Sequence, residues 1–165
     1  MRVPTDATLL ALRLTLAIVF LGHGWRHARH LSRTAAWAGS IGLRRPRYQA
    51  MTMAYGELAI GLGLGLGLAT AAAAAGAVAM MAVAFWTVHR RAGFFVSARP
   101  DEGWEYVFVV AVVAVSVATL GAGEWSLDHV LGWSGPTSGR AGALIATSGL
   151  VLAAGHLAAY YRRVP

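Results

Sequence analysis

The sequence predicts an all-α membrane protein, a bundle of apolar helices in a single transmembrane domain over residues 1–165. Two observations lead to this fold class. Apolar residues make up 57% of the chain and charged residues only 13%, whereas a soluble domain carries roughly 25% charged residues. In addition, no charged residue interrupts the stretch 58–88. Charge-free stretches of that length are typical of membrane-spanning helices, and buried helices of soluble proteins rarely contain them.

The apolar stretches divide into five predicted helices. The first is apolar apart from Arg13 and His23. A single helix over 58–88 would be about 46 Å long at ~1.5 Å per residue, which exceeds the ~30 Å hydrocarbon core of a bilayer. This stretch is therefore divided near residues 67–71 into the second and third helices. The fourth and fifth follow the charge-free stretches 106–123 and 141–161, so that the predicted spans are 7–25, 50–68, 70–89, 104–122 and 141–161.

The arginines predict how these helices are oriented, because basic residues are enriched on the cytoplasmic side of membrane proteins. Eleven arginines fall on one side, in the segments 26–49, 90–99 and 162–163, against two, Arg2 and Arg140, on the other. Since the basic clusters lie between apolar stretches, they indicate membrane orientation, and no nucleic-acid partner is expected. The prediction is a multi-pass protein of the bacterial cytoplasmic (plasma) membrane, with the N-terminus outside, the C-terminus in the cytoplasm and a basic cytoplasmic segment over 26–49. The bacterial origin rests on a composition rich in alanine, glycine and arginine without lysine.

Glycines at helical spacing predict where the helices pack closely. The second helix contains two overlapping GxxxG patterns, Gly61/Gly65 and Gly63/Gly67. Small residues at this spacing allow two helix backbones to approach each other within a membrane. The third helix offers a matching face, so we expect a tight hairpin between the two. The alternative is that Gly61 and Gly65 form a homodimer face.

Several ionisable residues lie within the predicted spans, where each costs roughly 2.5–3.5 kcal/mol near a helix centre. In the predicted topology four of them fall in the cytoplasmic half of the membrane, where they can converge on one polar cavity, with Arg13 above it. One interpretation is a buried Arg13–Glu57 pair that fixes the helix register. The other is a binding site for a small polar headgroup such as a quinone, or a proton relay. The residues concerned are Arg13, His23, Glu57, Glu105 and His156.

The absence of cysteine excludes a disulfide scaffold, a CxxC redox centre, an iron–sulfur cluster and a thiolate zinc site. Histidines 23, 27 and 30 share one helix face at i, i+4 and i+7, a spacing that can hold a metal. Arginines 26, 29 and 33 surround them, however, and no carboxylate is near in sequence. No metal site and no covalent cofactor are therefore predicted. A bis-histidine haem would need His23 to face His89 or His156, and this is the less favoured arrangement.

The order of several short motifs resembles the DoxX family of small integral membrane proteins over about residues 9–133. Each motif is weak alone, and their order and spacing make the resemblance specific. They are Arg13, the GHGW at 22–25, Glu57 followed by the glycines 61–67, the GFF at 93–95, the GWEY at 103–106 and the GAGEWSLD at 121–128.

The chain departs from the family pattern at three places. Arg26 and His27 stand where the family usually has a lysine after GHG, and the arginine often found after the second helix is absent. The family usually has four transmembrane helices, so the resemblance implies a bundle of four family-type helices plus a fifth C-terminal helix, 141–161, for which it gives no role.

The resemblance implies a redox-linked membrane role, since some relatives are membrane subunits of thiosulfate:quinone oxidoreductases and others associate with oxidative-stress and sulfur-transfer partners. It draws attention to Arg13, His23, Glu57, Glu105 and Asp128. For Asp128, within WSLD, the residues themselves favour a capping role at a turn.

The leading functional hypothesis is a membrane subunit of a quinone-linked redox system. Arg13 or His23 would hydrogen-bond a quinone carbonyl, and Glu57 would take or supply the proton. With no cysteine, flavin motif or dinucleotide fingerprint, the electrons would come from a bound quinone or a redox partner protein. The alternative is a non-catalytic scaffold in the lipid bilayer that docks cytoplasmic enzymes through its arginine-rich loops. A solute carrier is disfavoured, because no inverted repeat is evident.

Overall fold

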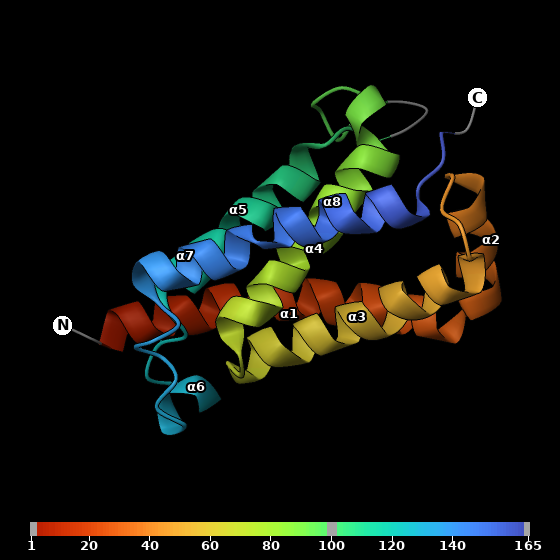
Figure 1. Ribbon diagram of the computed structural model, residues 1–165. Coiled ribbons are helices and arrows are strands. Elements are labelled where there is room, and N and C mark those ends of the chain that lie inside the picture. Colours follow the sequence, from red (N-terminus) through yellow and green to blue (C-terminus); the bar gives the residue numbers. More distant parts are fainter. Residues whose placement is uncertain (1–2, 99–101, 164–165) are drawn as a thin grey trace.

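The computed structural model describes residues 3–98 and 102–163 (Figure 1). Arg2 and Arg99, which contribute to the orientation argument, lie outside these ranges. In the described part of the chain the regular structure is helical, apart from an isolated bridge between Leu43 and Tyr161. The elements are α1 (Val3–Arg29), α2 (Leu31–Ser40), α3 (Pro46–Leu66), α4 (Thr70–Thr87), the 3-10 helix η1 (His89–Arg91), α5 (Glu105–Leu120), α6 (Leu127–Val130), α7 (Gly139–Thr147) and α8 (Gly149–Tyr160).

The helices occupy the predicted apolar stretches, with two differences in extent. α1 continues past the predicted end at residue 25 to Arg29, so that His27 lies on the same helix as His23. The predicted fifth helix consists of two parts, α7 and α8, separated at Ser148. The Ser148 hydroxyl donates a hydrogen bond to the carbonyl of Ile145 (2.6 Å), a contact between a side chain and the preceding helical turn that often accompanies a bend.

Three helical stretches are long and apolar enough to cross a membrane, by length and composition: α1, α4 and the combined stretch Gly139–Tyr160. α5 is apolar but has 16 residues, which gives about 24 Å at ~1.5 Å per residue. α3 has 21 residues but carries Gln49 and Glu57, both buried within the protein. The chain is therefore a multi-pass membrane protein. That α3 and α5 also cross the membrane stays a prediction.

α1 and α3 lie side by side and antiparallel, and theirs is the most extensive contact between two of the described helices (Figure 1). Gly24 of α1 lies against the backbone of α3, where an added Cβ would be 2.8 Å from the Leu58 nitrogen. Gly61 of α3 lies against α1, where an added Cβ would be 2.7 Å from the Leu21 Cγ. Glycine at both positions is what allows the two helices to approach so closely.

The glycine-rich part of α3 therefore packs against another helix of the same chain. Gly65 also faces α1, where an added Cβ would lie 3.3 Å from the Ala17 Cβ. The face predicted as a homodimer surface, at Gly61 and Gly65, is thus covered by α1 of the same chain. The predicted contact between α3 and α4 forms on another face of α3, where Gly76 packs against Ile60.

The core lies where α4 passes between the other long helices. α4 contacts α3, α5, α7 and α8. The small alanine side chains on its buried faces allow these helices to pack close to it. The buried cluster consists of Leu16, Ala17, Phe20, Ile60, Leu64, Ala71, Ala74, Ala77, Val78, Val110, Ala114, Val117, Ala118 and Ala146. Polar groups gather at the two ends of the bundle, on either side of this apolar centre.

Candidate functional site

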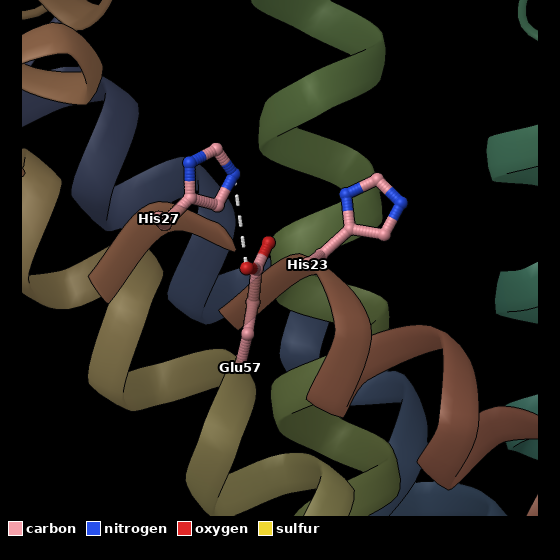
Figure 2. A group of neighbouring side chains, drawn as sticks. All are labelled: His23, His27 and Glu57. Carbon is pink, nitrogen blue, oxygen red and sulfur yellow. Dashed lines mark ion pairs between the residues drawn. The ribbon is translucent and has the colours of Figure 1, made fainter. Parts of the chain in front are cut away.

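Two histidines of α1 and one glutamate of α3 form a cluster near the α2 end of the bundle (Figure 2). His23 and His27 lie one helical turn apart, and the carboxylate of Glu57 points between their rings. The nearest nitrogen or oxygen atoms of the three side chains all lie within 4.8 Å of one another. Gly24 is next to His23 and brings α1 against α3, which allows the histidines to reach the carboxylate.

Glu57 is the most deeply buried member of the cluster. The residue is 7% exposed, and its Oε2 atom has no hydrogen-bond partner. The imidazole of His27, which carries a charge only when protonated, has its Nε2 3.8 Å from Glu57 Oε2. This separation is too long for a hydrogen bond. A buried carboxylate in this position is costly unless a proton, a cation or a ligand compensates it.

His27 is held in place from the other side by α2. Its Nδ1 lies 3.1 Å from the hydroxyl oxygen of Thr34, and its ring stacks on Trp37 at a centroid distance of 6.5 Å. If Nδ1 carries the proton and donates to Thr34, the lone pair of Nε2 faces Glu57. α2 therefore orients the imidazole that the carboxylate faces.

The cluster lines a cavity of about 520 Å³ between α1, α3, α4 and α5. His23, His27 and Glu57 lie on its polar wall, and the Tyr106 side chain of α5 also lines it. Apolar side chains supply most of the remaining wall, and η1 contributes His89. The apolar lining residues are Trp37, Met53, Met80, Met81, Val83, Ala84, Val96 and Val107. A second pocket of about 390 Å³, lined by the same two histidines and by Arg26, His30 and Arg33, adjoins the cluster on the α2 side.

Arg13 lies at the opposite end of the α1–α3 pair. It is fully buried, and its Nη2 donates a hydrogen bond to the carbonyl of Trp125. Arg13 is ten residues from His23 on α1, about 15 Å along the helix. The predicted Arg13–Glu57 pair therefore does not form, because the antiparallel packing places Arg13 beside Gly67, which follows the end of α3 and lies ten residues beyond Glu57.

Asp128 also lies at this opposite end and caps a helix. Its two carboxylate oxygens accept hydrogen bonds from the backbone nitrogens of Ala69 (2.7 Å) and Thr70 (2.8 Å) at the start of α4. Its own backbone nitrogen donates to the carbonyl of Gly67 (2.8 Å). Ser126 accepts from the His129 nitrogen and caps the short helix α6. The capping role expected for the WSLD segment is confirmed, and Asp128 caps α4, a helix distant in sequence.

Glu105 and His156 do not join the cavity of Glu57. Glu105 Oε2 accepts a hydrogen bond from the Val96 nitrogen (3.1 Å) and so holds the loop after η1. His156 lines a neighbouring, mostly apolar cavity of about 320 Å³ between α3, α4 and α8, which shares Met53, Met80 and Val83 with the first. The His156 ring contacts Tyr160. Of the four residues expected to converge on one cavity, the structure brings together His23 and Glu57.

The structure adds His27 and Tyr106 to the residues that the sequence predicted at the cavity. The i, i+4 spacing of His23 and His27 was the signal for the first, and the missing carboxylate is supplied by Glu57 from another helix. His30 does not extend this face, because α1 ends at Arg29 and His30 precedes α2 with φ −130°. Tyr106 resembled an ordinary interfacial aromatic residue in the sequence.

A family model for DoxX matches residues 8–90 of the chain. Searches against curated proteins and solved structures find no match. The matched region includes Arg13 and the cluster residues His23 and Glu57, whereas the motifs that contain Glu105 and Asp128 follow it. Because the match covers just over half of the chain's 165 residues, the chain belongs to the DoxX family.

Proposed function

We propose that the cavity beside Glu57 binds a quinone headgroup and that the chain is a membrane subunit of a quinone-linked redox system. The observation that carries the proposal is the cavity itself. Apolar side chains supply much of its lining, and polar groups from several helices also face it, with His23, His27 and Glu57 gathered on the side formed by α1 and α3. Ligand sites for flat, largely apolar molecules are commonly built in this way, with few polar groups that fix the orientation.

The polar groups suit both forms of a quinone. An imidazole N–H of His23 or the hydroxyl of Tyr106 can donate to a quinone carbonyl, and the Glu57 carboxylate can accept from a quinol hydroxyl. Reduction of a quinone to a quinol takes up two electrons and two protons. We assign the electrons to a redox partner protein, and we assign binding of the headgroup to this chain. Arg13, at the other end of the bundle, has no part in the proposal.

The proposal is tested by a thermal-shift titration of the purified, metal-stripped protein in detergent with ubiquinone and menaquinone analogues. We expect a saturable rise in melting temperature for the wild type. Glu57→Gln should lose the rise, because it replaces the carboxylate by a neutral amide, and Tyr106→Phe should weaken it, because it removes the hydroxyl group. His156→Gln is the matched control, since His156 lines the neighbouring cavity, and it should keep the full shift.

The absence of a shift with either quinone, in wild-type protein that remains monodisperse, would contradict the proposal. The alternative is then a scaffold that docks cytoplasmic enzymes. The exposure of Arg44, Arg45 and Arg47 before and at the start of α3 favours this second function. A variant that combines Arg44→Gln, Arg45→Gln and Arg47→Gln would abolish docking of a partner enzyme without changing a quinone-induced rise in melting temperature.

A further inference from the structure

We propose that His23, His27 and Glu57 bind a divalent transition-metal ion, of the class of Zn²⁺, Co²⁺ or Fe²⁺. The inference goes beyond quinone binding and does not depend on it, because the metal is held by the protein alone. Two imidazoles and one carboxylate form a ligand set that these ions accept, and such sites keep one or more coordination positions open for water or substrate.

The geometry of the three side chains fits one ion. Their nearest ligand atoms lie within 4.8 Å of one another, and the carboxylate lies between the two rings (Figure 2). Bonds of roughly 2.0–2.2 Å to nitrogen and oxygen place tetrahedral ligands about 3.3 Å apart. The His27–Glu57 separation is 3.8 Å, so small side-chain rotations bring the atoms to bonding distance of a shared ion.

The burial of Glu57 is an independent observation that points to a cation. Its side chain is 9% exposed in this cluster, and its Oε2 atom has no hydrogen-bond partner. Removing an ionised carboxylate from water without a partner is strongly unfavourable. A metal ion between Oε2 and the two imidazoles would compensate this charge.

The surroundings of His27 resemble the outer shell of a metal site. Metal-bound histidines generally donate their other ring N–H to an acceptor, which fixes the tautomer and directs the free nitrogen at the ion. Thr34 Oγ1 is such an acceptor at 3.1 Å from His27 Nδ1. The free Nε2 is then the atom that faces Glu57.

The neighbouring arginines weaken the site without preventing it. Arg26, Arg29 and Arg33 are all exposed, and the guanidinium of Arg29 lies over the ring of Trp25 at 5.7 Å from its centroid. Charges that extend into solvent are screened by water and salt. The Glu57 carboxylate, in contrast, is buried and acts at short range.

The test is isothermal titration of tag-free, chelator-stripped protein with Zn²⁺ in the absence of quinone, with Co²⁺ as a spectroscopic probe. We expect one ion per chain and visible Co²⁺ absorption bands of a low-coordinate site. His23→Gln, His27→Gln and Glu57→Gln should each weaken Zn²⁺ binding by roughly 10- to 100-fold or more, and Thr34→Val by about 10-fold. Tyr106→Phe, for which we expect weaker quinone binding, should leave Zn²⁺ binding unchanged.

His30→Gln is the matched control, because His30 is an exposed histidine near the cluster that is not among its ligands. It should retain the affinity of the wild type within about twofold. The proposal is overturned if folded wild-type protein binds no Zn²⁺, if the three cluster variants bind like the wild type, or if His30→Gln loses as much affinity as they do. If Glu57→Gln does not fold, the two histidine variants and the Co²⁺ spectrum decide.

Discussion

At the scale of single residues, the chain places its costly polar groups at two separate ends. Arg13 and Asp128 lie at the end near α6, where each hydrogen-bonds backbone groups, whereas Glu57 and its histidines line a cavity at the α2 end. The sequence indicated that such residues need partners, because ionisable groups in a membrane are expensive. It did not indicate which partner each one has, since that depends on the register of α1 against α3.

Asp128→Ala should destabilise the protein by about 1–3 kcal/mol, because the backbone N–H groups of Ala69 and Thr70 lose their acceptors. The measurement is the denaturation midpoint in detergent. His129→Ala serves as the control, since the His129 side chain is exposed in the same short helix. Equal midpoints for Asp128→Ala and the wild type would contradict the capping role.

Arg26→Gln should strengthen Zn²⁺ binding by roughly twofold at low ionic strength, because a positive charge next to the cluster is removed. The difference should shrink at ~1 M salt, where exposed charges are screened. Titration calorimetry at the two salt concentrations measures this effect. Weaker binding by Arg26→Gln at low salt would show that Arg26 supports the site, contrary to the expectation.

At the scale of the elements, the site depends on the close contact between α1 and α3. The sequence predicted the position of both helices from charge-free stretches and glycine spacing. The glycine face of α3 was expected to pack against α4 or against a second copy of the chain, because a GxxxG pattern does not specify which helix packs on it. The predicted first span ends at residue 25, whereas α1 continues to Arg29 and so brings His27 to the carboxylate of α3.

Gly24→Ala should push α1 away from α3 and disturb the cluster. The added Cβ would lie 2.8 Å from the Leu58 nitrogen and 2.9 Å from the Ala54 oxygen, and overpacking of this kind costs about 1–3 kcal/mol. Gly22→Ala is a matched control on the same helix, because its added Cβ meets no atom within 4 Å. We expect a lower melting temperature and weaker Zn²⁺ binding for Gly24→Ala only. Equal behaviour of the two variants would contradict this role of the helix contact.

At the scale of the whole molecule, composition and charge patterning were sufficient to predict an all-helical membrane protein, because the charge-free stretches have the length of transmembrane helices and exceed the ~9–11 residues of a transmembrane strand. Three candidate spans follow from the structure. The count of five spans and the orientation come from the arginine distribution and stay predictions. The location of the cavity depended on tertiary contacts that no local pattern encodes.

The topology can be tested by cysteine labelling, because the chain contains no cysteine. Ser32→Cys in α2 and Gly135→Cys after α6 introduce single thiols at exposed positions. Five spans predict that an impermeant maleimide added to intact cells labels residue 135 and leaves residue 32 unlabelled until the membrane is opened. Labelling of both positions in intact cells would exclude this topology.

The central claim, that the cavity beside Glu57 holds a quinone headgroup, is tested most directly by photolabelling with an azido-quinone analogue and mapping the modified residues by mass spectrometry. We predict adducts on the cavity wall, around Met81, Tyr106 and Val107, which excess unmodified quinone suppresses. Adducts confined to the neighbouring cavity around Leu152 and His156, or adducts that excess quinone does not suppress, would contradict the claim.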